Sequence, residues 1–217
     1  MTILSQSDRN EVARIFAKEL GPNNVRLINI VSENGCEYCK QTNELLREIV
    51  DISNGKITLE TYDLEKEKDK LSNHRVDRAP AIIISNGKSE TFNVRFYGIP
   101  AGYEFRSLLD DIIDVSKGST RLTDSVRAKI RDVSVPLTIK VFVTPSCPYC
   151  PRAVRIAHQF AMENEKIEAE MIESLEFPEL AEKYSVMAVP KIVINEKVEF
   201  EGAVPENVFL WKVLEAV

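Results

Sequence analysis

The chain has 217 residues, with 28 lysine and arginine side chains against 34 aspartate and glutamate side chains, so its formal net charge is −6. This length suits two small domains, each large enough for its own core. The acidic balance argues against nucleic acid as a partner. No apolar run approaches the length of a membrane span, and residues 1–20 lack the pattern of a signal peptide. We therefore expect a cytoplasmic protein without a membrane partner.

The first half of the chain alternates helical and strand patterns of hydrophobicity. Its first helix is predicted to be capped by Ser7. In chain order, the predicted elements are a helix over residues 7–20, a strand over 25–31, a helix over 36–52, a strand over 56–63, a helix over 65–73, a strand over 79–84 opened by Pro80, a turn at Asn86-Gly87, a strand over 91–97 and a helix around 105–113.

The second half repeats this order after a short linker at residues 116–119. Its predicted elements are a helix over residues 122–132, a strand over 137–143, a helix over 148–164, a strand over 166–173, a helix over 176–184, a strand over 189–194, a turn at 195–197, a strand over 198–201 and a helix over 205–217. Cys147 lies 111 residues after Cys36, and Pro190 lies 110 residues after Pro80. A repeat of this length indicates a duplicated domain, so the expected domains are residues 1–117 and 118–217.

All four cysteines of the chain lie in two CxxC motifs, Cys36-Glu37-Tyr38-Cys39 (site one) and Cys147-Pro148-Tyr149-Cys150 (site two). Each motif follows a predicted strand and opens a predicted helix. The first cysteine is therefore expected near unpaired backbone N–H groups and the positive end of the helix dipole. Both features favour the thiolate, which is the attacking species in thiol chemistry. Because the second thiol can close a small-loop disulfide, the motifs predict two reversible dithiol sites.

Two other interpretations of the cysteines stay open. The thiols could hold zinc, or an iron–sulfur cluster at a dimer interface, although structural zinc usually joins CxxC pairs about 15–20 residues apart. The chain could also be a binding or chaperone module without catalysis, because a fold does not fix a function. A zinc titration tests the first alternative, and an insulin-reduction assay tests the second.

Each half of the chain resembles a thioredoxin fold, in which a strand, a CxxC motif and a helix are followed by a proline-led strand. Residues 147–150 are the motif of glutaredoxins. Two such units in tandem resemble the protein disulfide oxidoreductases of thermophilic prokaryotes, most closely over residues 142–151 and 186–192. The resemblance implies an α/β protein with two tandem thioredoxin-like (glutaredoxin-like) units, each a central mixed β-sheet flanked by α-helices.

The same resemblance implies an enzyme that reduces, forms or rearranges protein disulfides by thiol–disulfide exchange. Cys36 and Cys147 would be the attacking thiols, and Cys39 and Cys150 the resolving thiols. The redox-active groups would be the disulfides Cys36–Cys39 and Cys147–Cys150, with no bound cofactor and no metal. The expected partners are proteins that carry disulfides or dithiols, and an NADPH-dependent flavoprotein similar to thioredoxin reductase.

The resemblance also assigns roles to the prolines that open the later strands. Pro80 and Pro190 would be cis-prolines that face the CxxC motifs. The backbone of Ala79 and Val189 would then pair with an extended substrate peptide, as in strand addition. Thioredoxins carry a buried carboxylate in the strand before the motif, but here that strand offers Asn29 in one half and Lys140 in the other. The sequence therefore leaves the proton acceptor for the resolving thiols open.

The two sites differ in the residue that follows the first cysteine. Glu37 places a carboxylate there, which opposes the Cys36 thiolate by roughly 0.7–1.4 kcal/mol at about 6 Å. Pro148 adds no charge at site two. A more stable thiolate stabilises the reduced form and raises the reduction potential, so site two is expected to be the more oxidising. His158 has no motif around it and is expected to be structural or exposed, and Trp211 is expected in the core.

Overall fold

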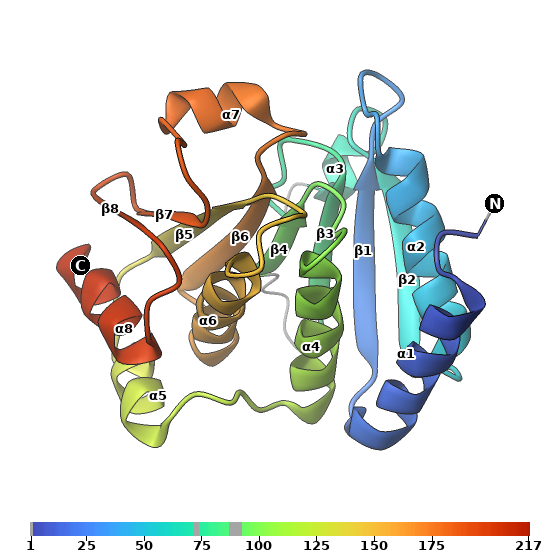
Figure 1. The fold of residues 1–217 in the computed structure, drawn as a ribbon, viewed down its shortest axis with the longest axis horizontal. Coiled ribbons are helices and arrows are strands. Elements are labelled where there is room, and N and C mark those ends of the chain that lie inside the picture. The colour runs from blue at the N-terminus through green and yellow to red at the C-terminus, as the bar shows by residue number, and fades with distance from the viewer. Residues whose placement is uncertain (1, 72–73, 87–92) are drawn as a thin grey trace. The chain divides into compact units, whose positions relative to one another are not determined.

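The structure is a computed structural model that describes residues 2–71, 74–86 and 93–217 (Figure 1). Spatial contacts divide the chain into two compact units. Unit 1 groups Met1–Phe92, Tyr97–Ile99 and Ile112–Ser119, and unit 2 groups Asn93–Phe96, Pro100–Asp111 and Thr120–Val217. Helix α4 (Glu104–Lys117) is divided between the units, because its first two turns group with unit 2 and its remaining residues group with unit 1. The division into domains at residues 117 and 118 stays a prediction.

The sheet of unit 1 has the strand order β2-β1-β3. Its strands are β1 (Val25–Val31), β2 (Ile57–Asp63) and β3 (Ala81–Ser85). β1 pairs in parallel with β2 and antiparallel with β3, so the sheet is mixed. Its helices are α1 (Gln6–Glu19), α2 (Cys39–Ile52), α3 (Lys68–Leu71) and the end of α4. A parallel pair needs a crossover connection, and α2 provides it between β1 and β2.

The sheet of unit 2 repeats this arrangement in the order β6-β5-β7-β8. Its strands are β5 (Leu137–Val143), β6 (Ile167–Glu173), β7 (Lys191–Ile194) and β8 (Val198–Glu201), and β4 (Val94–Tyr97) lies beside β6. β5 pairs in parallel with β6 and antiparallel with β7. The helices are α5 (Asp124–Arg131), α6 (Cys150–Glu163), α7 (Pro178–Lys183) and α8 (Glu206–Glu215). The predicted fold class, two thioredoxin-like units with mixed sheets, is confirmed.

The cores of both units come from the apolar residues that the sequence pattern places in the central strands and the motif helices. In unit 1, the fully buried residues include Leu27, Ile28 and Ile30 of β1 and Leu46 and Ile49 of α2. Burial of one such side chain stabilises the fold by about 1.5–3 kcal/mol. Since β1 and β5 are central in their sheets, the loops that leave them are held firmly, and these loops carry the CxxC motifs.

Three predicted helix starts were wrong. The first helix is capped by Ser5 and not by Ser7, because the Ser5 hydroxyl accepts a hydrogen bond from the Asp8 N–H and the Asp8 carboxylate accepts one from the Ser5 N–H. This reciprocal pair is a capping box. The motif helices begin at Cys39 and Cys150, so only the second cysteine of each motif lies in the helix.

Some predicted elements fall partly outside the described residues. The end of the predicted helix over residues 65–73, the turn at Asn86-Gly87 and the first residues of the predicted strand over 91–97 include residues 72–73 and 87–92. Within the described part of the chain, no helix is long and apolar enough to cross a bilayer.

Candidate active sites

Site two lies in unit 2, at the junction between β5 and α6. The chain makes a close turn after β5, in which the Cys147 N–H donates a hydrogen bond to the Thr144 carbonyl oxygen over 3.2 Å. Helix α6 begins after this turn, at Cys150, with Tyr149 as its N-cap and Pro151 in its first turn. Cys147 therefore precedes the helix N-terminus, and Cys150 lies in its first turn.

Cys147 faces the backbone beside Pro190. Its thiol donates a hydrogen bond to the Val189 carbonyl oxygen over 3.6 Å. The Val189–Pro190 peptide bond is cis, as expected. The Pro190 carbonyl oxygen accepts a hydrogen bond from the Gly202 N–H over 2.8 Å, which ties the start of β7 to the end of β8. The backbone at residues 189 and 190 is thus fixed directly against the sulfur of Cys147.

Cys150 lies behind Cys147 and is fully buried. Burial raises the pKa of the Cys150 thiol far above its ordinary value, and a hydrogen bond with Cys147 raises it further. A hydrogen bond from the Thr144 backbone opposes this shift, whereas the charge of Glu104 adds to it. Cys150 therefore stays a neutral thiol at physiological pH, and it needs a base if it is to act as a nucleophile.

Glu104 is the carboxylate whose charge raises the pKa of the Cys150 thiol. It is not among the site residues predicted from the sequence. It lies in the first turn of α4, and its side chain is almost completely buried. Burial raises the pKa of Glu104 to about 7, and the Ser107 hydroxyl lowers it slightly. One signal was present in the sequence, because Glu104 precedes Leu108 by one helical turn and so lies on the apolar face of the predicted helix.

The loop before α4 is held against the CxxC loop of site two. The Tyr103 N–H donates a hydrogen bond to the Pro145 carbonyl oxygen over 3.1 Å. Gly102, with φ of +57°, lies so close to Pro145 that a Cβ atom would collide with the Pro145 carbonyl oxygen. Only glycine adopts this backbone conformation without a steric penalty. This close approach brings Glu104 to the buried side of site two.

Site one lies in unit 1, at the junction between β1 and α2. Cys36 and Cys39 form a disulfide with a Cα–Cα distance of 5.5 Å. The Ser32 N–H donates a hydrogen bond to the Cys39 sulfur over 3.3 Å. The Ser32 hydroxyl donates to the Glu65 carboxylate over 2.8 Å, and Glu65 is exposed. The acid next to site one is therefore solvated, whereas the acid next to site two is buried.

The rest of site one follows the pattern of site two. The Ala79–Pro80 peptide bond is cis, as expected, and the Pro80 carbonyl oxygen accepts a hydrogen bond from the Gly98 N–H over 2.9 Å. Asn29 is fully buried in β1, and its side-chain amide donates to the Asn43 side chain over 3.2 Å. An amide cannot accept a proton at neutral pH, so Asn29 does not replace the buried carboxylate of thioredoxins.

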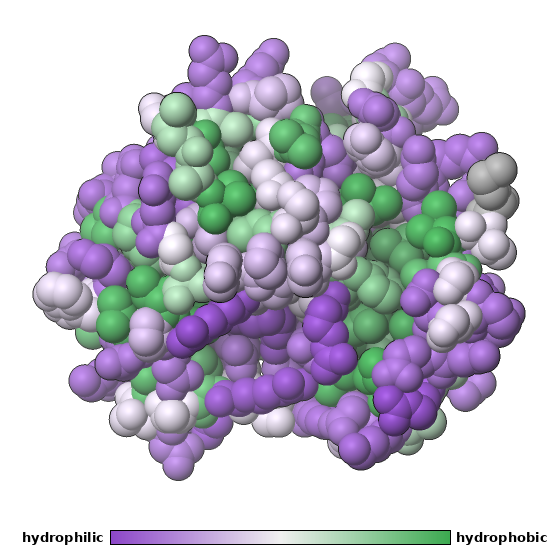
Figure 2. Space-filling view, viewed as in Figure 1, coloured by the Kyte–Doolittle hydropathy of each residue, from purple (hydrophilic) through white to green (hydrophobic). Residues whose placement is uncertain are grey.

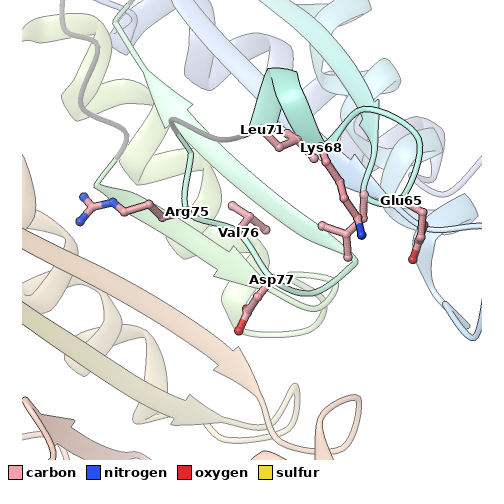
Figure 3. A pocket seen from close by; sticks show the side chains of 7 residues that line it. Glu65, Lys68, Leu71, Arg75, Val76 and Asp77 are labelled. Carbon is pink, nitrogen blue, oxygen red and sulfur yellow. The ribbon is translucent and has the colours of Figure 1, made fainter.

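A surface pocket of about 410 Å³ lies in unit 1 between α3 and the segment that leads to Pro80 (Figure 3). Its lining combines apolar with charged side chains, namely Leu64, Leu71 and Val76, and Glu65, Lys68, Arg75 and Asp77. The Asp77 carboxylate is paired with the Arg78 guanidinium by two hydrogen bonds of 2.7 and 2.8 Å. Because Glu65 also contacts Ser32, the pocket borders both the cis-proline segment and the residue that contacts Cys39.

Neither motif gathers a set of metal ligands in the structure. Over residues 2–71, 74–86 and 93–217, no three or more histidine, cysteine, aspartate or glutamate side chains form a group that could hold a metal ion. At site two, Cys147 and Cys150 are both free thiols.

Comparison with known proteins gives the family. A model of the thioredoxin domain matches residues 26–110 and 137–215. The crystal structure of a protein disulfide oxidoreductase from Aeropyrum pernix is 35% identical, covers 98% of this chain and 93% of its own, and superposes with a TM-score of 0.89. The NTD_N/C domain of the alkylhydroperoxide reductase AhpF from Enterococcus faecalis is 26% identical, covers 97% of this chain and 99% of its own, and superposes with a TM-score of 0.87.

A longer relative matches most of the chain. This relative, a subunit of the alkyl hydroperoxide reductase of Staphylococcus aureus, is 29% identical over 177 residues, which are 82% of this chain but 31% of that protein. The chain thus spans about a third of the length of the curated relatives it matches first. The two matched thioredoxin segments and the likeness to the Aeropyrum structure cover both units. The chain therefore belongs to the thioredoxin domain family and is similar, over nearly its whole length, to a protein disulfide oxidoreductase.

Proposed function

We propose that the chain is a protein disulfide oxidoreductase that works through site one and site two. The observation that carries this proposal is the geometry of site two. The Cys147 thiol contacts the Val189 carbonyl beside cis-Pro190, and the buried Cys150 thiol lies behind it with Glu104 as its neighbouring acid. Cys147, which is 9% exposed, would meet the substrate, whereas Cys150, which is 0% exposed, would be protected from it, with Glu104 as the acid whose charge acts on it.

The reaction transfers two electrons from the dithiol to a substrate disulfide. The Cys147 thiolate attacks one sulfur of the substrate, the substrate S–S bond breaks, and the leaving sulfur takes a proton. Cys150 then attacks the Cys147 sulfur of the mixed disulfide. The mixed disulfide breaks, the second substrate sulfur leaves as a thiol, and the Cys147–Cys150 disulfide remains. Oxidation of a substrate dithiol follows the same path in reverse.

Glu104 is the proposed proton acceptor for the second step. Cys150 must lose its proton to attack, and its raised pKa makes the free thiolate rare. With a pKa of about 7, Glu104 is partly ionised near neutral pH and can accept that proton without going through solvent. General-base catalysis of this kind contributes about 10²–10⁴-fold.

At site one, Cys36 is the proposed attacking thiol and Cys39 the resolving thiol. The Ser32 hydroxyl links the surroundings of Cys39 to the exposed Glu65 carboxylate. The pocket in Figure 3 is lined in part by Arg75, Val76 and Asp77, which lie just before Ala79 and Pro80 in the chain. It would therefore receive a side chain of a peptide that pairs with the Ala79 backbone. The apolar part of its lining, Leu64, Leu71 and Val76, favours aliphatic side chains.

The proposed substrates are proteins, because site two is surrounded by exposed apolar side chains. Four of them come from the loop before α4, the motif, the loop between β6 and α7 and the segment before Pro190, namely Tyr103, Tyr149, Leu175 and Met187. Met187 is 90% exposed. In Figure 2, apolar (green) residues lie among polar ones in the region of α7. A protein chain that pairs with the backbone of Val189 and Pro190 would cover them.

The proposed electron donor is an NADPH-dependent flavoprotein similar to thioredoxin reductase, and the proposed location is the cytoplasm. The matched relatives from Staphylococcus aureus support the first point, because in them the matched region is part of a longer reductase subunit. The presence of two dithiol sites supports an isomerase activity as well, since one reduced site can attack a wrong disulfide while the other stores an oxidised pair.

Reduction of insulin disulfides tests the proposal. We expect the wild-type chain to accelerate reduction by dithiothreitol, and we expect Cys147→Ser/Cys150→Ser and Cys36→Ser/Cys39→Ser to isolate the contribution of each site. The variant with all four cysteines replaced should be inactive. Wild-type protein that is inactive but binds stoichiometric zinc would instead support a structural zinc protein, and inactive metal-free protein would support a binding module.

A further inference from the structure

A buried group of charged side chains joins α4 to α6 two turns below site two. It consists of Asp111 from α4 and of Arg155 and His158 from α6. The Asp111 carboxylate forms an ion pair with the Arg155 guanidinium and contacts His158 Nδ1 over 2.7 Å. His158 Nε2 contacts the Arg95 carbonyl oxygen in β4 over 3.1 Å, and the Phe96 ring packs edge-on against the imidazole.

The positions of these residues repeat those of the catalytic pair. On α4, Asp111 follows Glu104 by seven residues, which is two helical turns, so both lie on one face. On α6, His158 follows Cys150 by eight residues and lies on the face that carries Cys150. The two helices therefore meet at two levels. At the first level the charge of Glu104 acts on the buried Cys150 thiol, and at the second Asp111 contacts His158 and Arg155.

At the first level, the only group described as acting on the Glu104 carboxylate is the Ser107 hydroxyl, which belongs to the same helix. No described residue outside α4 makes a hydrogen bond of normal geometry to either of its oxygens. Its distance from Cys150 therefore depends on where the backbone of α4 lies. That backbone is held at one end by the bond from the Tyr103 N–H to the Pro145 carbonyl oxygen. Two turns further along, Asp111 is the buried residue of the same helix that pairs with α6.

Arg155 and His158, at the second level, do not change their protonation state near neutral pH, where the enzyme would work. Burial lowers the pKa of His158 to about 3, and the charge of Arg155 adds to this effect. Burial also lowers the pKa of Arg155, to about 10. His158 is therefore neutral and Arg155 charged at neutral pH, so neither exchanges protons with site two. The role that remains for Asp111, Arg155 and His158 is to hold α4 and α6 together.

Buried ion pairs are poor sources of stability, because the desolvation of the charges offsets most of their attraction. Apolar side chains would join two helices as tightly, but they would allow small shifts along the interface. A hydrogen-bonded carboxylate, imidazole and guanidinium fix distance and register together. A misplacement of about 1 Å in a reacting pair costs on the order of 10²-fold in rate, so register matters at the first level.

We infer that Asp111, His158 and Arg155 form a positioning group, which fixes α4 against α6 so that Glu104 stays within reach of the Cys150 thiol. The inference rests on the proposed function of site two. The contacts described for these three side chains are with one another and with β4, so we expect them to act on the reaction through Glu104.

The test is a double-mutant cycle on the second step of the reaction. In the background Cys36→Ser/Cys39→Ser, a mixed disulfide between Cys147 and a thiol peptide is formed at low pH, and release of the peptide is followed after a jump to higher pH. Asp111→Asn should slow release by about 10- to 100-fold at pH 8 and should flatten its rise through pH 7. Glu104→Gln should slow release at least as much. Because the positioning group acts through Glu104, Asp111→Asn should cause no further loss when Glu104→Gln is already present.

His158→Leu provides a second variant in case Asp111→Asn does not fold, since it leaves the ion pair of Asp111 with Arg155 in place. It should also slow release, by a smaller factor. Glu163→Gln is the matched control. The Glu163 carboxylate is 5% exposed and pairs with Arg127 and Arg131 over 3.2 and 2.7 Å, so it joins α6 to α5 and not to α4. It should destabilise the protein but leave the release rate and its pH dependence unchanged.

The outcomes separate this inference from the proposed function. If the wild-type protein forms no mixed disulfide at Cys147, the proposed function of site two fails. If the wild type and Glu163→Gln release peptide normally and Asp111→Asn and His158→Leu do so too, only the positioning role fails. Equal losses in Glu163→Gln and Asp111→Asn, or additive losses in the double variant with Glu104→Gln, would reduce the group to a purely structural one.

Discussion

Glu104 and Cys150 are 1% and 0% exposed, and the charge of the carboxylate raises the pKa of the thiol. Glu104 lies in the first turn of α4, and Cys150 lies 46 residues later in the sequence, in the first turn of α6. An acid and a thiol that are buried together share the cost of ionisation, since only one of them can carry a negative charge at low cost. We therefore expect the proposed second step of the reaction at site two to depend on pH near neutrality.

The rate of the second step should rise with pH through about 7. Below that pH, Glu104 is protonated and cannot accept the proton of Cys150, whereas above it the carboxylate is present. Glu104→Gln should lower the rate above pH 7 by about 100-fold and remove this rise. Single-turnover release of a peptide from its mixed disulfide with Cys147, measured between pH 5 and 9, checks this. A Gln variant with an unchanged profile would show that another group accepts the proton.

The same substitution should stabilise the folded protein at alkaline pH. The folded-state pKa of Glu104 is raised to about 7 from its ordinary 4.5, so the folded chain holds this proton more tightly than the unfolded chain does. Stability is therefore lost as the pH rises from about 4.5 to 7, by about 3 kcal/mol in total. Glu104→Gln should be more stable than the wild type by up to that amount at pH 8 and about equally stable at pH 4.

Urea unfolding of both proteins at the two pH values measures this difference, with Glu65→Gln as the control, because Glu65 is exposed. A Glu104→Gln variant that is less stable than the wild type at pH 8 would mean that the ionised carboxylate is well solvated in the folded state.

Gly102 should be less tolerant of substitution than Gly202, although both have positive φ angles. A Cβ at Gly102 would collide with the Pro145 carbonyl oxygen, whereas no described atom lies within 4 Å of a Cβ at Gly202. Both alanine variants lose about 1 kcal/mol from backbone strain, but Gly102→Ala must also displace the loop of site two. We expect a larger loss of melting temperature and slower peptide release at site two for Gly102→Ala alone. Equal effects of the two substitutions would show that the contact with Pro145 is easily relieved.

Site two should be more oxidising than site one. The prediction comes from Glu37, whose carboxylate opposes a thiolate at Cys36, whereas Pro148 adds no charge beside Cys147. Redox titration of each site against glutathione, in variants with the other CxxC pair replaced by serine, gives the order of the two potentials. Glu37→Pro should reduce the gap. A higher potential at site one would show that groups other than Glu37 control the difference.

The sequence predicted the parts of each site that depend on local pattern. The CxxC motifs, the strands before them and the proline-led strands all have short-range signals, and the cis peptide bonds before Pro80 and Pro190 agree with the resemblance. The two motif helices were predicted to start too early, because the hydrophobic pattern does not show the turn that separates each strand from its helix. Trp211 was expected in the core but is 60% exposed, since the apolar face of α8 is formed instead by Phe209, Leu210 and Val213.

The groups that complete site two could not be predicted, because they depend on tertiary packing. The first two turns of α4 group with unit 2, although the sequence repeat assigns them to the first half of the chain. Glu104 and Asp111 therefore reach Cys150 and His158 across a long separation in sequence, which no local pattern records. The sequence did show a polar residue on the apolar face of the helix, at position 104, and a buried acid in such a position indicates a functional or paired group.

The central claim, that Cys147 attacks and Cys150 resolves, is tested most directly by trapping the mixed disulfide. Variants in which Cys36 and Cys39 are both serine are combined with either Cys150→Ser or Cys147→Ser, mixed with a disulfide-linked peptide and analysed by mass spectrometry. We expect the Cys150→Ser protein to accumulate a peptide adduct on Cys147, whereas the Cys147→Ser protein, with its buried thiol, should form none. An adduct on Cys150 in the Cys147→Ser protein at a comparable rate, or no adduct in either protein, would contradict the claim.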